Sequence, residues 1–331
     1  MSYDTSYTVE ECSSLLQYIP FRISLLFHST AAISSFFTTF YFLHKHIHSS
    51  PIHPNFKFLL LVYFFNSYAR GVFFVGSVIS FFYRILSDDI FMNPLVFQLL
   101  HLFFALSMII DGTIKVLLIL ERGVATRRVE RYEGQSSKKW MYSVIIILFP
   151  VTIICIVYQN ADFSRQSCFA FFAPRNTENG INLLFLVAFT FAFAAFIVLR
   201  WLIRMNKKKL GLNNFQLTAR YQIRENLLCS HLASSVLLTS LLVTTFYGLS
   251  MITLRLAHFQ VFQDNREFFS TMKVCLYPFA VGDFIIPMYS GWQINRCKAA
   301  KLAFLNRDVT DCRERQKTTE AYEGMLRKQW A

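Results

Sequence analysis

Three charged side chains fall on one face of a predicted helix. Asp111 and Lys115 are four residues apart inside a block of apolar residues, so the two groups lie within pairing range on a helix. Arg122 follows eleven positions after Asp111, which at about 100° per residue returns it to within roughly 20° of the same face. A charge in an apolar helix is costly, so these side chains are candidates for ligand binding, for gating or for a self-neutralised packing contact.

Two other apolar blocks carry ionisable or amide groups. Asn66 and Arg70 are four residues apart and share a face, and Asp283 lies near the middle of the last block. Asp283 could pair with Arg70 or with Lys115, and the sequence leaves both pairings open. The predicted set of intramembrane polar residues is therefore Asn66, Arg70, Asp111, Lys115 and Asp283.

A carboxylate and a guanidinium adjoin each other where the third apolar block stops, at Glu121-Arg122. Glu225 occupies a similar place just before the sixth block. An arginine–carboxylate bond across two helix ends is directional and is opened by a small helix movement, so Arg122 and Glu225 are candidates for a switch that a cytosolic partner reads. The alternative is that Glu121 and Glu225 only neutralise the adjacent Arg122 and Arg224.

The elements that must position these groups are membrane-spanning helices. The chain has 331 residues, of which 54% are hydrophobic, 17% aromatic and 16% charged, whereas a soluble domain carries about 25% charged residues. The apolar residues come in seven blocks of a length that crosses a bilayer. The sequence therefore predicts an all-α integral membrane protein with seven transmembrane helices. We expect them at residues 21–43, 57–83, 94–120, 140–158, 181–203, 227–254 and 270–291.

The distribution of lysine and arginine predicts the orientation of this 21–291 domain. Residues 1–20 contain neither residue type, whereas the segments that follow blocks three and five, and the tail, are rich in both, and the segment after block one carries Lys45 and Lys57. By the positive-inside rule, residues 1–20 form an extracellular N-terminus and residues 292–331 a cytoplasmic tail. Within the tail, 294–305 could form a basic amphipathic helix on the membrane. The net charge of +13 is thus a sign of topology and of contact with lipid headgroups, and does not indicate nucleic-acid binding.

Two cysteines fall on the predicted outer side, Cys12 and Cys168. They could form a disulfide, which persists outside the cell, or remain two free thiols. On the inner side, Cys297 stands between Arg296 and Lys298. It is a candidate for palmitoylation, with a spare thiol as the alternative.

Three stretches carry a resemblance to a known family: "HPNFKFLLLVYFFNSYARGVFF" (53–74), "ERGVATRRVERYE" (121–133) and "RYQIREN" (220–226). Their order and placement resemble nematode serpentine chemoreceptors of the Sra superfamily, most of all class epsilon (Sre), with Srab and Srb as the nearest alternatives. The resemblance covers essentially the whole chain. It implies a set of residues for switching and G-protein coupling, namely Glu121, Arg122, Tyr132, Glu133, Arg220, Tyr221, Gln222, Glu225 and Asn226.

The resemblance also implies a function. It indicates a G-protein-coupled chemosensory receptor for a small molecule, in the plasma membrane of sensory-neuron cilia, with a heterotrimeric G protein and membrane lipid as partners and no cofactor. Two motifs depart from those of better-known receptors. Gly123 stands where the Asp-Arg-Tyr motif has its tyrosine, and "DFIIPMY" (283–289) only resembles Asn-Pro-x-x-Tyr. We expect the ligand among helices three, five, six and seven, in a pocket lined by phenylalanines that could equally face lipid, namely Phe185, Phe189, Phe191 and Phe193.

Other classes of membrane protein compete with the receptor. A seven-helix ligand-gated channel would have the inverted topology, which the lysine and arginine distribution opposes. A transporter would more often show internal repeats. An enzyme is not expected, because "HKHIH" (44–48) with His53 lacks carboxylate partners for a metal, and no catalytic triad or phosphate-binding loop is present. We therefore expect no catalytic residue and no metal site.

Overall fold

The computed structural model describes residues 8–48, 53–87, 89–128, 139–163, 167–172, 174, 176–211, 217–261, 265–296 and 299. Within these ranges, seven helical spans are long and apolar enough to cross a membrane. The prediction of a seven-helix, all-α membrane bundle is confirmed. The spans are Ile19–His48, Pro54–Ser87, Pro94–Arg127, Lys139–Val157, Asn179–Leu210, Gln222–Leu254 and Glu267–Arg296.

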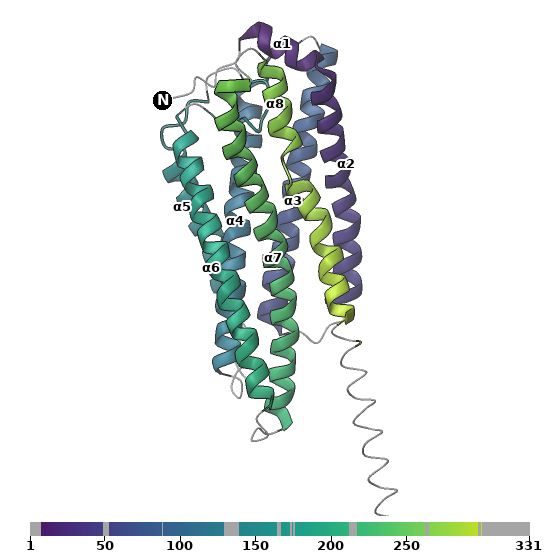
Figure 1. Cartoon of the computed structure of the whole chain (residues 1–331), viewed down its shortest axis with the longest axis vertical. Helices are drawn as coiled ribbons and strands as arrows, with labels where there is room; N and C mark the ends of the chain where they lie inside the picture. The colour runs from purple at the N-terminus through teal and green to yellow at the C-terminus, as the bar shows by residue number, and fades with distance from the viewer. Residues whose placement is uncertain are drawn as a thin grey trace, which may run out of the picture.

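The spans run up and down the long axis of one bundle, and a short helix, α1, lies across one end of it (top of Figure 1). We call this end the disulfide end, and the opposite end the arginine end. The helices in chain order are α1 (Val9–Gln17), α2 (Ile19–Phe42) with a wide π-helical turn η1 (Leu43–His48), α3 (Pro54–Ser87), α4 (Pro94–Arg127), α5 (Lys139–Val157), α6 (Glu178–Gly211), α7 (Leu217–Val261), α8 (Arg266–Cys275) and a final helix over 279–296.

Two helices continue beyond their apolar blocks at the arginine end. α4 runs seven residues past Leu120 to Arg127, and α7 begins at Leu217, ten residues before the apolar block. These polar extensions contain no proline, and Glu, Arg and Ala favour the helix enough that one glycine, Gly123, does not end α4. Arg122 and Glu225 therefore stand on regular helix and not in loops.

The seventh span, by contrast, is broken. α8 ends at Cys275, and the next helix starts at residue 279. Pro278 explains the break, because proline has no N–H to donate and its ring crowds the preceding turn. The N–H of Gly282 then donates to the carbonyl of Pro278 at 2.8 Å, which starts the final helix.

The lipid-facing surface is most evident on α6. Phe191 and Phe193 are 60% and 51% exposed, as are neighbouring leucines and valines along the same helix. Of the phenylalanines expected to line a pocket, these two face outward, where lipid would surround them. Phe185 instead packs against Tyr247 of α7, with ring centroids 5.3 Å apart.

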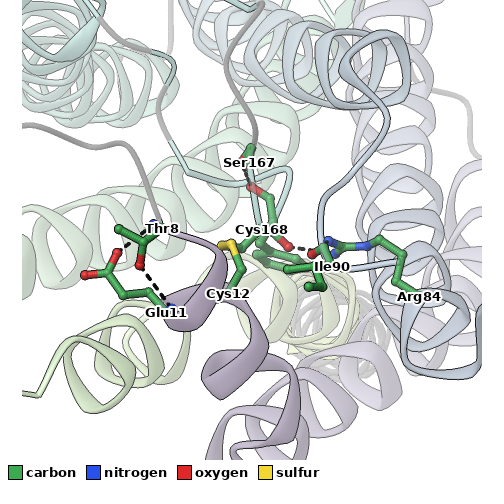
Figure 2. The surroundings of a disulfide bond; sticks show 8 residues. Thr8, Glu11, Cys12, Arg84, Ile90, Ser167 and Cys168 are labelled. Atoms are coloured by element: carbon green, nitrogen blue, oxygen red, sulfur yellow. Dashed lines mark hydrogen bonds between the residues drawn. A yellow bond between two sulfur atoms is a disulfide. The ribbon is translucent and has the colours of Figure 1, made fainter. Parts of the chain in front are cut away.

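The disulfide end is closed by a pinned segment, residues 167–172. A disulfide joins Cys168 to Cys12 of α1, with Cα atoms 5.5 Å apart (Figure 2). The Arg84 guanidinium of α3 donates to the carbonyl of Cys168 at 2.6 Å and to that of Ile90 at 3.3 Å. Phe171 of the segment points into the bundle and contacts Phe104, with ring centroids 4.4 Å apart. Residues 167–172 thus cover this end of the helix bundle, and we call this segment the roof.

A histidine of α4 fixes the same roof. His101 Nδ1 lies 2.9 Å from the carbonyl oxygen of Ala170, and Nε2 lies 2.9 Å from the hydroxyl of Tyr158. A carbonyl only accepts, so Nδ1 carries the proton and Nε2 of the neutral ring accepts from Tyr158. Burial raises the pKa of Tyr158 above its ordinary value, so this hydroxyl stays protonated. His101 is thus a packing residue with both ring nitrogens hydrogen-bonded.

The disulfide should stabilise the closed roof. We predict that Cys12→Ser and Cys168→Ser each lower the thermal unfolding midpoint of the purified protein, because loss of a native disulfide costs about 2–5 kcal/mol. The double variant should unfold at the same temperature as either single variant, since all three lack the same bond. Cys155→Ser is the control, because that thiol is free and exposed. Midpoints equal to that of the unchanged protein would contradict a disulfide-pinned roof.

Candidate functional site

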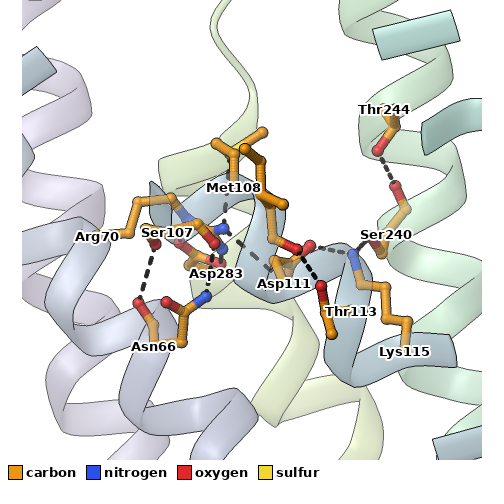
Figure 3. A network of polar contacts seen from close by, with 11 residues as sticks. Asn66, Arg70, Ser107, Met108, Asp111, Thr113, Lys115, Ser240, Thr244 and Asp283 are labelled. Carbon is orange, nitrogen blue, oxygen red and sulfur yellow. Dashed lines mark hydrogen bonds and ion pairs between the residues drawn. The ribbon is translucent and has the colours of Figure 1, made fainter. Parts of the chain in front are cut away.

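A buried ion pair joins the second span to the seventh. The Arg70 guanidinium of α3 grips both carboxylate oxygens of Asp283, with Nε donating to Oδ2 at 2.9 Å and Nη2 bonded to Oδ1 (Figure 3). The two residues are only 4% and 5% exposed. A two-point arginine–carboxylate bond fixes both distance and orientation. Of the two pairings that the sequence left open for Asp283, the structure shows the one with Arg70.

A second pair lies beside the first. Lys115 Nζ bonds to Asp111 one turn earlier on α4 and to the hydroxyl of Ser240 on α7. Asp111 Oδ1 also lies 3.9 Å from Arg70 Nη1. The four charged groups thus form one network across α3, α4, α7 and the final helix, as Figure 3 shows.

Amide and hydroxyl groups complete this network on the α3–α4 side. Asn66 Nδ2 donates to the carbonyl of Ser107 at 2.8 Å, and the Ser107 hydroxyl donates to the carbonyl of Asn66 at 3.4 Å. Two acids and two bases sum to zero charge. Removing one member would leave a buried charge without its partner, which costs far more than the intact pair gains.

The arginine end is organised around Arg122, which is 1% exposed. Its Nε donates to Glu121 at 2.6 Å and its Nη1 donates to Asn226 Oδ1 of α7 at 3.2 Å. The guanidinium also lies over the ring of Phe56, 4.5 Å from the ring centroid, a favourable cation–π position. Asn226 in turn donates to the carbonyl of Ala125 at 3.0 Å. Asn226 thereby bridges α4 and α7.

Glu225, the carboxylate expected to hold Arg122, bonds to the residue just before α3. Its Oε1 accepts a hydrogen bond from the backbone N–H of His53 at 2.8 Å. The same histidine lies 3.9 Å from the Glu121 carboxylate through Nδ1. Asn226 is thus a hydrogen-bond partner of Arg122 on α7, while Glu225 holds the start of α3 and also acts electrostatically on Arg122. We name the group Glu121, Arg122, Glu225, Asn226 and His53 the arginine cluster.

Contacts to α6 extend the arginine cluster. Asn206 Nδ2 donates to the hydroxyl of Thr126 at 2.9 Å, and Lys209 donates to the carbonyl of Thr126 at 2.8 Å. These contacts tie the last turn of α4 to α6. Sequence reasoning missed Asn206, Ser240 and His53 as members of the two sites. An isolated Asn or Ser in an apolar helix gives a weak signal, and only the packing shows what it meets.

Several predicted site residues cannot be placed in these clusters. Gln222 is buried on the first turns of α7, and the backbones of Arg220 and Tyr221 belong to the same helix. Tyr132, Glu133 and Cys297 lie outside the described residues, as does most of the predicted amphipathic segment. Within the described ranges, no group of three or more His, Cys, Asp or Glu side chains could hold a metal ion.

Seven spanning helices, a neutralised ion network in their core and an arginine at the end of the third span define a seven-transmembrane receptor fold. A match to a known protein family identifies the class of receptor more closely. Residues 6–310 match the family model described as serpentine type 7TM GPCR receptor class ab chemoreceptor. The chain therefore belongs to this family of serpentine receptors.

Curated relatives from Caenorhabditis elegans match along most of the chain. Serpentine receptor class beta-16 is 26% identical over 94% of this chain and 93% of its own length. Serpentine receptor class beta-17 is 22% identical over 94% of this chain and 87% of its own length. Serpentine receptor class beta-3 is 25% identical, with 76% of each chain covered. The resemblance to nematode serpentine receptors is thus confirmed. The assignment to class epsilon is not confirmed. The matching family model is that of class ab (Srab), one of the two alternatives, Srab and Srb.

The ion network yields a stability prediction. Arg70→Gln should destabilise the protein by about 3–5 kcal/mol, because Asp283 would then be a buried charge without its main partner. Arg70→Gln combined with Asp283→Asn should recover most of this loss, since neither charge remains. Arg200→Gln is the control, because that side chain is exposed on α6. Thermal unfolding of the purified variants checks the cycle, and additive losses in the double variant would contradict the pairing.

Proposed function

We propose that the chain is a G-protein-coupled chemosensory receptor that senses a small molecule from outside the cell. Membership of a chemoreceptor family supports the sensory part. The observation that carries the coupling part is Arg122, which is fully buried at the end of α4 and bonded across to Asn226 of α7. An arginine held in this way between two helix ends can be released by a small separation of the helices.

The proposed orientation puts the disulfide end outside the cell. Disulfides persist in oxidising surroundings, and the Cys12–Cys168 bond lies at that end. Exposed basic side chains collect at the other end, among them Arg127, Arg128, Lys207 and Lys208. The positive-inside rule places such residues in the cytoplasm, where they would also meet anionic lipid headgroups. The receptor would then lie in the plasma membrane, with sensory-neuron cilia as its proposed site.

The proposed mechanism is a shift between two arrangements of the bundle. Ligand binding favours the arrangement with which it makes better contacts. In that arrangement the ends of α4 and α7 separate, and Arg122 leaves Asn226 and the ring of Phe56. The guanidinium, together with the segment 204–226, then engages a heterotrimeric G protein. Glu225 contributes by holding His53, and through it the start of α3, in the resting arrangement.

Basal signalling tests this mechanism. We predict that Asn226→Ala and Glu225→Ala each raise ligand-independent G-protein activation severalfold, because each removes a bond that holds the resting arginine cluster. A loss of about 1 kcal/mol from the resting state changes the equilibrium about fivefold. The measurement is nucleotide exchange on a panel of purified G proteins, with receptor amounts matched by surface labelling.

The matched control is Ser230→Ala, one turn further along α7. That hydroxyl is buried and has no hydrogen-bond partner among the described residues, so its removal should leave basal exchange unchanged. Basal exchange by Asn226→Ala and Glu225→Ala equal to that of Ser230→Ala, on every G protein of the panel, would count against the proposed mechanism.

A further inference from the structure

A histidine stands where three helices of the arginine cluster meet. His53 is the residue before α3, and its carbonyl accepts a bond of the first helical turn, from the N–H of Lys57 at 3.0 Å. Its own backbone N–H donates to the Glu225 carboxylate of α7 at 2.8 Å. Its ring lies beside the Glu121 carboxylate of α4, with Nδ1 3.9 Å from Oε1. One residue thus reaches α3, α4 and α7 through different atoms.

The ring of His53 caps α3. Its Nδ1 accepts a hydrogen bond from the backbone N–H of Asn55 at 3.3 Å, the kind of bond that an N-cap side chain makes to the second residue of a helix. A nitrogen that accepts carries no proton, so the ring is neutral in this arrangement. A protonated ring carries a proton on both nitrogens and cannot accept this bond. Capping by His53 therefore depends on the charge of its ring.

A carboxylate oxygen that lacks a hydrogen bond lies next to the ring. Glu121 is 2% exposed, and the Nε and Nη2 groups of Arg122 both contact its Oε2. The other oxygen, Oε1, has no hydrogen-bond partner among the residues that the structure describes, and it is the oxygen nearest to His53 Nδ1. A buried carboxylate oxygen calls for a donor. A protonated Nδ1 would supply it and leave the Arg122 contacts in place.

The nearest charged groups favour a proton on the ring. Glu121 lies on its α4 side and Glu225 on its α7 side, and two carboxylates stabilise an imidazolium. Arg122 offsets part of this negative charge, but it binds Glu121 through the other carboxylate oxygen. Tyr142 of α5 and Cys229 of α7 also lie near the Glu121 carboxylate. A phenol and a thiol are uncharged near neutral pH, so these two groups do not oppose the proton by their charge.

Basic side chains on the neighbouring elements are partly exposed or face elsewhere. Lys57 of α3 donates through Nζ to the carbonyl of His48, at the end of η1, at 2.7 Å. Arg224 precedes Glu225 on α7 and is half-buried. Water screens such partly exposed charges more than it screens buried ones. His46 of η1 faces Gly291 of the final helix. The carboxylates therefore dominate the surroundings of the ring.

We propose that His53 is a proton-binding site through which cytosolic pH regulates the receptor. The neutral ring caps α3, whereas the protonated ring instead donates to Oε1 of Glu121 and so joins the start of α3 to α4. Because Glu225 holds the backbone of the same residue, protonation ties α3, α4 and α7 together in the resting arrangement. A fall in cytosolic pH then lowers signalling. The proposal rests on the function and the orientation proposed above for its biological role.

Thermal unfolding of the purified full chain in lipid nanodiscs tests the proton site, over a range from about pH 8 to about pH 6 that spans the ordinary imidazole pKa of about 6.5. His53→Asn is the variant, because an asparagine side chain still caps a helix but does not titrate. A proton that the folded chain holds more tightly than the unfolded chain stabilises the fold at low pH, and this gain disappears as the pH rises. We therefore expect the unfolding midpoint of the unchanged chain, relative to that of His53→Asn, to rise as the pH falls.

A midpoint difference that stays constant with pH, or that grows as the pH rises, would overturn the proposal. Glu121→Gln is a second variant, because it removes the carboxylate and keeps an oxygen that Arg122 can bind. In that background, adding His53→Asn should no longer change the pH dependence of unfolding. His44→Asn is the matched control: this histidine of η1 is exposed, and its loss should leave the pH-dependent gain intact.

Signalling gives a separate readout. We expect basal nucleotide exchange by the unchanged chain, relative to His53→Asn at the same pH, to fall about fivefold between about pH 8 and about pH 6, the effect of one additional hydrogen bond in the resting state. Relative exchange that rises on acidification would overturn the proposal. Constant relative exchange, together with a pH-dependent unfolding midpoint, would overturn the proposed coupling through the arginine cluster and leave the proton site standing, because unfolding is measured without a G protein.

Discussion

The mutual neutralisation of four buried charges is the constraint on which this structure depends. A lone charge in the middle of a membrane bundle is costly, so Arg70, Asp111, Lys115 and Asp283 must find one another. Their contacts reach α3, α4, α7 and the final helix. The relative positions of these spans are therefore coupled, because rotation or translation of one helix would break an ion pair or hydrogen bond that it makes with another. A bundle held by such a network changes between discrete arrangements and does not deform continuously.

The two ends of the bundle are closed in different ways around this core. At the disulfide end, a covalent bond, Arg84 and His101 hold residues 167–172 as a roof. At the other end, hydrogen bonds of Arg122 and Asn226 hold α4 against α7. A covalent closure resists opening, whereas hydrogen bonds between helix ends can exchange for bonds to a partner. This asymmetry fits a receptor whose outer end is fixed and whose inner end moves.

Much of the fold could be predicted from the sequence, because seven apolar blocks of bilayer length leave few other architectures. The charged residues of the core could also be identified, since a charge such as Asp283 is conspicuous in an apolar block. Its partner could not, because pairing depends on helix rotation and on the break at Pro278. The same limit applies to Arg122: spacing suggested Glu225, and only the packing reveals Asn226 as a hydrogen-bond partner. Hydroxyl and amide groups such as Ser240 and Asn206 give only a weak signal until their neighbours are known.

Orientation is the claim that decides most directly between this receptor and other seven-helix proteins, because it puts the roof outside and Arg122 next to the cytoplasm. We would tag both ends of the full chain, express it in cultured cells and stain the tags before and after permeabilisation. The account predicts that the N-terminal tag is stained on intact cells and the C-terminal tag only after permeabilisation. The reverse pattern would contradict it, since Arg122 would then face outward, away from any G protein, and an inverted seven-helix channel would become the better explanation.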